Sequence, residues 1–283
     1  MTAPVRIAVP SKGRLRDSCI DLLSHAGYSI GGFKGAGQAS SNESGIEFIE
    51  MRPRDAAQWL AAGRLEAAFI STDTSLEAGA DSLPSMGLGF SRSELMIAVR
   101  EDDPRQSLAE LAGGVIATHL PNWTRRHFES LGIDVTVVPM GGALEGPVAV
   151  GIADAIIDLR ETGGSLARNR LRVLETFCDC EALFVTAPQP VAEVEDMTLR
   201  IGAALAARRT QYVMLHIERD KIDQLSGLFP GLAAPTVLPL AGRDDLVAAH
   251  IVVQRKNLWA KLADLRALGA TGIVALPTDA IVD

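Results

Sequence analysis

Short apolar runs alternate along the chain with segments whose apolar residues recur at helical spacing. The runs at 5–10, 46–51 and 65–70 have the length and apolar content of buried strands. The segment after the first run keeps a helical period to about Ala26, where Gly27 ends it. Because strands and helices alternate in this way, the pattern predicts an α/β fold in which helices cover parallel sheets.

The alternation continues with less regular spacing through the middle of the chain. Residues 31–45 are rich in Gly and Ser and are expected to form a mobile loop. A basic helix is expected after the turn at 119–124. The other expected strands are 94–99, 115–118, 135–139, 153–158, 173–177 and 182–186, and the other expected helices are 107–112, 166–171 and 194–208.

The last segment has a different order of elements. The pattern predicts a strand, a helix, two strands, a helix and a strand, which is the ferredoxin-like order. These elements are expected at 212–217, 221–228, 236–238, 247–254, 257–268 and 272–276. The sequence therefore predicts a separate α+β domain from about residue 210.

Composition agrees with several cores built from aliphatic residues. The chain has 283 residues, of which 47% are apolar but only 5% aromatic. Cores of Ala, Val, Leu and Ile suit parallel sheets that are buried on both faces. The formal net charge of −8 argues against nucleic acid as a partner, although it allows a local basic pocket for polyphosphate.

Targeting signals and cysteines point to the cytoplasm. No apolar run is long enough to cross a bilayer, and the first residues do not have the design of a signal peptide. Cys19, Cys178 and Cys180 are too few for a disulfide framework, and the spacing of the last two is neither the redox nor the zinc spacing. We therefore expect a reducing, cytoplasmic location and no membrane partner.

The stretch 153–166 carries the clearest candidate chemistry. An apolar strand containing Asp154 and Asp158 leads into the turn 161–165, which is rich in Gly and hydroxyl residues, and then into a short helix. Free backbone N–H groups at such a turn and helix start form a cradle for an anion. Thr162 and Ser165 add hydroxyl donors.

The same residues also fit an ordinary strand-to-helix turn with a Ser cap. Asp158 favours the cradle, because a carboxylate just before it is placed to hold ribose hydroxyls or a magnesium ion. Phosphate, hydroxyl and acid together indicate a phosphorylated sugar. The turn is not the nucleoside-triphosphate P-loop, since no Gly-Lys-Ser/Thr follows it.

Two basic turns follow predicted strands of the first sheet. Lys12 and Arg14 follow the run 5–10, and Arg52 follows the run 46–51. Open α/β sheets bind their ligands beyond the carboxyl ends of the strands. The alternative is that all three are solvated surface charges, which is the commonest position of basic side chains.

Several of these stretches together resemble one family. Residues 154–159 followed by 162–166 resemble the phosphoribosyl-pyrophosphate loop of the long form of ATP phosphoribosyltransferase. Its opening signature resembles Pro-Ser-Lys-Gly-Arg-Leu at 10–15, and the resemblance runs along nearly the whole chain. Further matches are Arg-Pro-Arg-Asp at 52–55, Thr-x-x-Pro-Asn at 118–122 and Gly-Gly-Ala-Leu-Glu at 141–145.

The resemblance implies a fold and a reaction. The implied fold is a two-lobed core like that of periplasmic binding proteins, with lobe I at 1–90 and 180–209 and lobe II at 91–179. A ferredoxin-like, ACT-like regulatory domain would follow at 210–283. The implied reaction transfers the 5-phosphoribosyl group from phosphoribosyl pyrophosphate to N1 of ATP and releases pyrophosphate. Mg²⁺ is the implied cofactor, histidine the implied feedback inhibitor, and a homo-oligomer, dimer or hexamer, the implied assembly.

The resemblance also assigns roles to residues. The expected catalytic residues are Asp154, Asp158, Lys12 and Arg52, with Asp158 also a metal ligand. Phosphoribosyl pyrophosphate is expected to contact Glu161, Thr162, Gly163, Gly164, Ser165 and Leu166. ATP or diphosphate is expected at Arg14, Ser71, Thr72, Asp73, Pro121, Asn122 and Glu145, and histidine at Thr236, Leu240, Ile273 and Ala275.

Two other functions remain open on the sequence. Where the family usually has Gly and a basic residue before Asp73, this chain has Ser71 and Thr72. That difference favours a diverged paralogue that uses another acceptor. A non-catalytic small-molecule binding or regulatory protein on the same scaffold is the third possibility. His119 and His127 flank the Pro-Asn turn, but nothing in the sequence orients either as a base.

Overall fold

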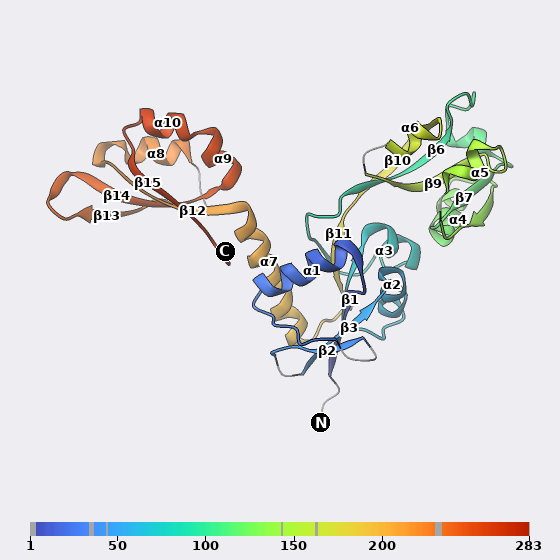
Figure 1. Ribbon diagram of the computed structural model, residues 1–283, viewed down its shortest axis with the longest axis horizontal. Coiled ribbons are helices and arrows are strands. Elements are labelled where there is room, and N and C mark those ends of the chain that lie inside the picture. The colour runs from blue at the N-terminus through green and yellow to red at the C-terminus, as the bar shows by residue number, and fades with distance from the viewer. Residues whose placement is uncertain are drawn as a thin grey trace. The chain divides into compact units, whose positions relative to one another are not determined.

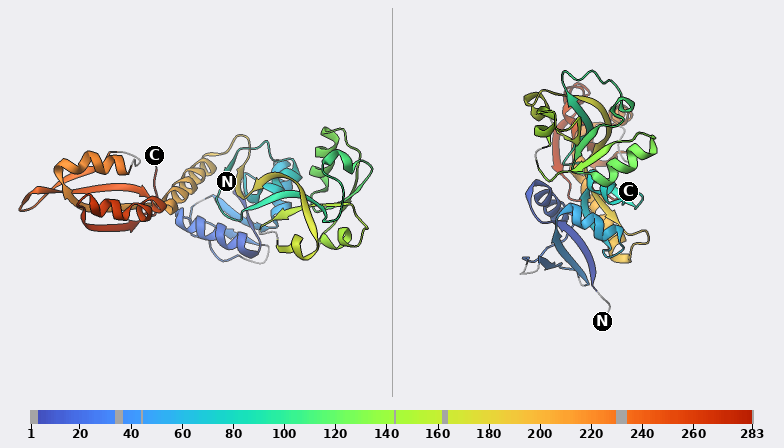
Figure 2. Two further views of the ribbon diagram at one scale, coloured as in Figure 1. Left: turned by 90° about the horizontal axis from the view of Figure 1, so that it is seen from above. Right: turned by 90° about the vertical axis from the view of Figure 1, so that its right-hand side faces the viewer.

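The computed structural model describes residues 4–33, 37–43, 45–142, 144–161, 164–229 and 234–282. Their strands form three separate sheets, which can be followed in three views in Figures 1 and 2. Residues 1–21 with 29–195 make one compact unit, and 22–28 with 196–283 make a second. The finer three-part division that the resemblance implied remains a proposal.

The first sheet has the strand order β2-β3-β1-β4-β11-β5. Its centre is parallel, because β1 (Val5–Pro10) pairs in parallel with β3 (Ile46–Met51) and with β4 (Ala67–Ser71). The remaining strands are β2 (Gln38–Ser40), β5 (Ser85–Gly87) and β11 (Ala182–Thr186), and the helices are α1 (Gly13–His25), α2 (Pro53–Ala61) and α3 (Thr72–Ala78). The edge strand β2 forms inside the stretch that the sequence predicted to be a loop.

Local sequence explains where the helices of this sheet begin and end. Arg52 is extended and Pro53 takes the first turn of α2, where the missing N–H costs nothing. Gly79, with φ of +69°, ends α3 in the left-handed conformation that glycine adopts readily. Ala56, Ala57 and Leu60 of α2 then pack on the sheet in one buried cluster. This side of the sheet is sealed by aliphatic residues, as the low aromatic content predicted.

The second sheet has the order β10-β6-β9-β7-β8. Strand β7 (Val115–Thr118) pairs in parallel with β8 (Thr136–Pro139) and β9 (Ala155–Arg160). Strand β6 (Ser93–Arg100) is antiparallel to β9 and to β10 (Leu171–Cys180). The helical segments are η1 (Leu108–Leu111), α4 (Pro121–Ser130), α5 (Glu145–Ala149) and α6 (Gly164–Arg168).

Two segments connect the first sheet to the second. Residues 88–92 lead from β5 into β6, and Glu181 alone separates β10 from β11 (Figure 1). The Glu181 carboxylate accepts the N–H of Gly89 at 2.7 Å, so it joins the two segments. A Cβ at Gly87 would lie 2.5 Å from Glu181 Oε1, so a side chain there would displace this carboxylate. Two α/β sheets joined by a double crossing confirm the predicted two-lobed core.

The third sheet is antiparallel, with the order β13-β14-β12-β15. If its four strands are numbered 1 to 4 in chain order, their order across the sheet is 2-3-1-4. This is the ferredoxin-like topology that the sequence predicted. The strands are β12 (Thr210–Glu218), β13 (Thr236–Leu240), β14 (Arg243–Gln254) and β15 (Thr271–Pro277). The helices are α7 (Ala192–Arg209), which precedes the sheet, η2 (Arg219–Lys221), α8 (Ile222–Leu228), α9 (Arg255–Ala260) and α10 (Leu262–Ala267).

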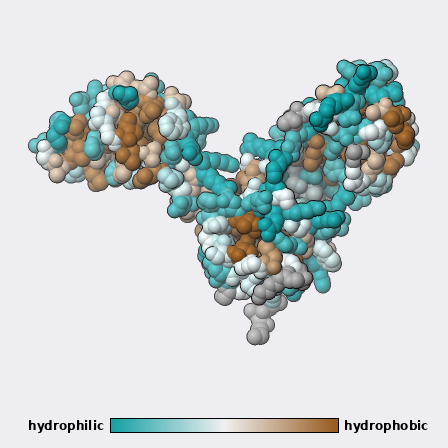
Figure 3. Space-filling view, viewed as in Figure 1, coloured by the Kyte–Doolittle hydropathy of each residue, from teal (hydrophilic) through white to brown (hydrophobic). Residues whose placement is uncertain are grey.

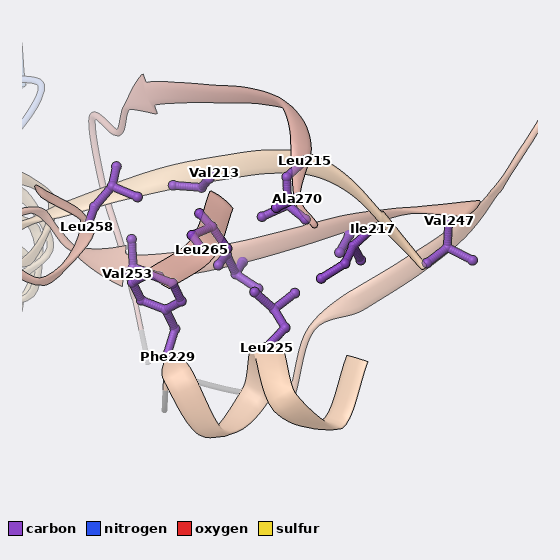
Figure 4. Close-up of a cluster of buried hydrophobic side chains, with 12 residues drawn as sticks. Val213, Leu215, Ile217, Leu225, Phe229, Val247, Val253, Leu258, Leu265 and Ala270 are labelled. Carbon is purple, nitrogen blue, oxygen red and sulfur yellow. The ribbon is translucent and has the colours of Figure 1, made fainter. Parts of the chain in front are cut away.

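The core of this domain lies between its helices and one face of the sheet. Every second residue of β12 is buried, as expected for a sheet covered on one side. Figure 4 shows the buried side chains from β12 and β14 meeting those of α8, α9 and α10. The sequence predicted one helix at 257–268, but the structure breaks it at Lys261, whose ammonium donates to the Leu228 carbonyl at 2.6 Å.

No helix in the described part of the chain is long and apolar enough to cross a membrane.

The C-terminal core gives a stability prediction. Leu225 of α8 is fully buried, so Leu225→Ala should lower the free energy of unfolding of this domain by about 2–5 kcal/mol through the cavity it leaves. Native-state hydrogen exchange of the β12 amides measures that change. Val274, which is 45% exposed on the same sheet, is the control: Val274→Ala should cost under about 1 kcal/mol. Equal effects of the two substitutions would contradict the assigned core.

Candidate active site

The predicted basic residues lie at the carboxyl edge of the first sheet. Pro10 of β1 is in register with Met51 of β3, and the N–H of Ser11 donates to the Met51 carbonyl at 3.0 Å. Lys12 and Arg52 therefore follow neighbouring strand ends, and both side chains are exposed. The structure thus brings these two cations to the edge at which α/β sheets bind ligands.

Acidic residues and the described part of the predicted cradle lie at the carboxyl edge of the second sheet. Asp158 is near the end of β9, Glu145 begins α5 after β8, and His119 follows β7. The Ser165 hydroxyl, in the first turn of α6, donates to the Glu145 carboxylate. This bond lowers the pKa of Glu145, since it stabilises the ionised form. Gly164 and Leu166 also belong to α6, whereas Thr162 and Gly163 lie outside the described residues.

His119 lies between carboxylates of the two lobes. Its Nδ1 is 3.4 Å from Asp158 Oδ1, and its Nε2 is 4.0 Å from Asp73 Oδ2 in α3. Asp73 is 5% exposed, and its other oxygen has no hydrogen-bond partner among the described residues. The sequence indicated no role for His119, because the partners of a lone histidine are known only after folding. Its place directly after a parallel strand was the one available signal.

The environment of Asp158 is unusual for a carboxylate. Burial raises the pKa of Asp158 above its ordinary value of 3.8, and the nearby charges of Glu145 and Asp73 act in the same direction. The Leu159 N–H at 2.7 Å and His119 oppose this rise. These surroundings destabilise the ionised form of Asp158. A nearby cation or hydroxyl donor would stabilise it, and a metal ion or the ribose hydroxyls supply such groups.

Three further contacts join the lobes beside this group. The Glu77 carboxylate of α3 accepts the N–H groups of Asn122 and Trp123 at 3.0 and 2.9 Å. It therefore satisfies the open N–H groups at the start of α4, where Pro121 is the first residue. Arg14 of α1 reaches Glu161 at 3.1 Å, with both side chains exposed. Two predicted ligand residues, Arg14 and Glu161, thus pair with each other.

Ser71 and Thr72, which depart from the family pattern, both have structural partners. The Ser71 hydroxyl caps α3 in a reciprocal arrangement with Thr74. The Thr72 hydroxyl donates to the Glu181 carbonyl at 3.2 Å and accepts the Glu181 N–H at 3.1 Å. Thr72 therefore fastens α3 to the segment that connects the lobes.

A cavity of about 720 Å³ opens beside this connection. Thr72 and Glu161, both predicted ligand residues, line it together with Arg92 and Arg160. Arg160 pairs with the Glu94 carboxylate, also in the lining. The cavity is large enough for a nucleotide-sized molecule.

The structure holds Asp154, a predicted catalytic residue, away from this group. Asp154 precedes β9, and the four residues to Asp158 span roughly 13 Å of strand. Its oxygens accept the Val115 N–H at 2.8 Å and the Arg105 guanidinium at 2.7 Å. The Val115 bond, followed by the one from Arg105, lowers the pKa of Asp154. This geometry favours a structural role over the catalytic one that the resemblance implied.

The predicted effector residues are also separated. Thr236 and Leu240 lie on β13, and Ile273 and Ala275 on β15, which are the two opposite edges of the C-terminal sheet. Three strand spacings put these edges roughly 14 Å apart. Ile273 also packs against the domain core. One copy of the domain does not place all four residues around one small ligand.

The fold and the charged groups at its strand ends are typical of a two-lobed protein that binds phosphorylated ligands. Two family models match the chain: ATP phosphoribosyltransferase over residues 52–205, and the HisG C-terminal domain over residues 207–280. The chain belongs to the ATP phosphoribosyltransferase family. It is accordingly a phosphoribosyltransferase of the histidine-biosynthesis type, and the resemblance found in the sequence is confirmed.

Relatives match the chain along almost its whole length. ATP phosphoribosyltransferase of Gemmatimonas aurantiaca is 33% identical over 98% of this chain and 99% of its own. That of Methanopyrus kandleri is 31% identical over the same shares. Among solved structures, a chain of the ATP phosphoribosyl transferase (HisG:HisZ) complex from Thermotoga maritima is 25% identical, with a TM-score of 0.59. The match covers 70% of this chain and 98% of that one.

Asp154 gives a pH-dependent prediction. Its pKa in the folded protein lies below the ordinary 3.8, so its stabilising contribution is full at neutral pH and is lost as the pH falls through that range. Asp154→Asn should therefore destabilise lobe II by about 1–2 kcal/mol at pH 7, and by less as the pH approaches 3. Thermal melts across this pH range measure the difference. If Asp154→Asn keeps its stability but binds substrate more weakly, the result would instead support the catalytic assignment.

Proposed function

We propose that the strand ends of the two lobes catalyse transfer of the 5-phosphoribosyl group from phosphoribosyl pyrophosphate to N1 of ATP. The observation that carries the proposal is the convergence of Asp158, Glu145 and Asp73 around His119 and Ser165. Lys12 and Arg52 supply positive charge at the strand ends of the first sheet. The reaction requires carboxylates that bind the sugar hydroxyls and cations that bind the polyphosphate.

Each group has a physical task in the proposed reaction. The turn before α6 holds the 5-phosphate, with Gly164 and Ser165 offering backbone N–H donors and the Ser165 hydroxyl exchanging Glu145 for the phosphate. Asp158 holds the ribose hydroxyls and offsets positive charge as the C1–O bond to pyrophosphate breaks. Lys12, Arg14 and Arg52 stabilise the negative charge on the leaving pyrophosphate. N1 of adenine is already a nucleophile, so the reaction needs no strong base.

A magnesium ion fits this site as a companion of the pyrophosphate. No group of three or more His, Cys, Asp and Glu is arranged to hold a metal within the described ranges. Mg²⁺ commonly binds through one or two carboxylates together with substrate phosphates and water. Asp158 is the proposed protein ligand. The Asp73 oxygen without a partner in the described residues is a second carboxylate oxygen available for the ion or its water ligands. Bound there, the ion would neutralise charge on the pyrophosphate.

The pair Ser71–Thr72 supports a second candidate, the same transfer to a different acceptor. Thr72 lines the cavity at the position where the family pattern has a basic residue. Its hydroxyl already donates a hydrogen bond to the Glu181 carbonyl. Mixing purified protein with phosphoribosyl pyrophosphate, Mg²⁺ and ATP tests the first proposal through pyrophosphate release and formation of the adduct. Replacing ATP by GTP, ADP or free purines in parallel tests the second.

We propose that the C-terminal domain binds histidine and that the chain assembles as a homo-oligomer, a dimer or a hexamer. The sheet face away from the helices carries exposed Leu238, Val274 and Leu276, and hydrophobic residues are visible on this domain in Figure 3. Because the predicted effector residues lie on opposite sheet edges, a site built from both edges requires a second copy. The substrates named here agree with a cytoplasmic location.

Asp158 gives the sharpest catalytic prediction. Asp158→Asn removes the charge that stabilises the developing ribose cation and should lower turnover on the order of 10²-fold or more. Steady-state pyrophosphate release measures the effect. Asp154→Asn, just before the same strand, is the matched control and should keep its turnover once folded. A fully active Asp158→Asn variant would remove Asp158 from the mechanism.

Salt dependence tests the cationic side of the site. If Lys12 and Arg52 bind polyphosphate, affinity for ATP or for phosphoribosyl pyrophosphate should fall as ionic strength rises. Lys12→Ala should weaken binding and flatten the salt dependence, as titration calorimetry at several salt concentrations would show. Arg64→Ala, an exposed cation after α2, is the control. If the affinity does not depend on salt, these residues are ordinary solvated surface charges and do not bind polyphosphate.

Histidine binding tests the regulatory proposal. Calorimetric titration of histidine into the intact protein should give saturable heat that weakens when substrates are present, because coupling between two sites is reciprocal. Thr236→Ala should weaken the binding without changing turnover in the absence of histidine. If millimolar histidine gives no heat and no thermal shift, the domain has only a role in assembly.

A further inference from the structure

Two thiols meet on β10 next to the connection between the lobes. The Sγ atoms of Cys178 and Cys180 are 4.0 Å apart, because residues two apart on a strand point to the same face. Both cysteines are free; Cys180 is 2% exposed at the wall of the cavity, and Cys178 is half-buried. Neither has a part in the proposed transfer reaction.

The strand is irregular where the thiols lie. Cys178 pairs with Leu95 and Cys180 with Ser93 on β6, and the register shifts between Thr176 and Cys178. Such irregularities bend a strand locally and make further puckering easier. Directly after Cys180 comes Glu181, the residue that Thr72 fastens to α3. A change of shape at the thiols therefore acts on one of the two connections between the lobes.

We propose that Cys178 and Cys180 form a peroxide-sensitive dithiol that closes to a disulfide within β10. The Cys178 thiolate attacks one oxygen of hydrogen peroxide, breaking the O–O bond and giving a sulfenic acid and, after proton transfer, water. The Cys180 thiol then attacks the sulfenic sulfur, forms the S–S bond and releases a second water. Two thiols are oxidised by two electrons, and one peroxide is reduced to two waters.

The environments of the three cysteines support this order of events. A hydrogen bond from Cys180 lowers the pKa of Cys178 to about 7, so a substantial part of it is thiolate at neutral pH. The same contact, with burial, raises the pKa of Cys180, so Cys178 is the attacking thiol. Cys19 of α1 is fully buried, and burial raises its pKa to about 12. Cys19 is therefore a built-in control thiol.

Closing the disulfide changes the strand. An S–S bond is about 2.05 Å long, so the sulfurs must approach by roughly 2 Å and draw the backbone of residues 178–180 together. The pairs with Ser93 and Leu95 cannot all survive this contraction. Oxidation is expected to loosen the ladder between β10 and β6 at the connection and so to lower turnover in the proposed reaction.

The test uses the intact, reduced protein and hydrogen peroxide, with no substrate present. Both cysteines lie in one tryptic peptide, 173–200, and Cys19 lies in another, 17–34. After brief oxidation, peptide 173–200 should lose about 2 Da, the mass of two hydrogens, and a reducing agent should restore it. Cys19 should remain open to alkylation once the protein is unfolded. Because the readout is thiol chemistry, it is independent of whether the proposed transfer reaction is correct.

Variants and exchange complete the test. Cys178→Ser and Cys180→Ser should each abolish the 2 Da loss, whereas Cys19→Ser should leave it unchanged. Hydrogen exchange at the amides of 93–95 should become faster on oxidation in the native chain and in Cys19→Ser, but not in the other two variants. Addition of oxygen to Cys178 without loss of two hydrogens, a disulfide between chains, or no change in peptide 173–200 would each overturn the proposal.

Discussion

Both connections between the α/β sheets join the edges at which the parallel strands end. In the first sheet, β5 and β11 are antiparallel to their neighbours, so 88–92 and Glu181 leave from the carboxyl edge of β4. In the second sheet the same segments enter beside the carboxyl end of β9, where Glu94 pairs with Arg160. This topology alone requires the two carboxyl edges to be close, and every residue of the proposed site depends on it.

Charged side chains make contacts across these edges. His119 between Asp73 and Asp158, Glu77 at the start of α4, and Arg14 with Glu161 are all charge-based contacts. Charged contacts can be exchanged for ligand or water with little loss, whereas a large apolar interface cannot. The buried cores of the lobes are two different clusters, and Leu76 of α3 packs against the cluster of the second lobe. A site of this kind can bind and release charged substrates without disturbing either core.

The C-terminal domain follows a different logic. Its alternating strands bury one face under three helices and leave the other with exposed apolar residues. A domain that holds so much apolar surface outside its own core is suited to association. Assembly and effector binding are therefore the natural proposals for it, and catalysis is not. The residues expected to bind histidine lie at both edges of this sheet, which makes the two proposals depend on each other.

The sequence by itself determined the class of fold and the order of elements, and it is the basis for the proposed phosphate cradle. Apolar periodicity and turn residues act locally, so β1, α1 and the C-terminal β-α-β-β-α-β order were predictable, and family likeness identified the reaction class. The structure decided what depends on contacts distant in the chain. Asp154 binds Arg105 and lies away from Asp158, and His119 lies between the two lobes. Thr72 binds the segment that connects the lobes, and the effector residues lie on two opposite sheet edges. Side-chain partners such as these are set by strand order and register, which no local pattern encodes.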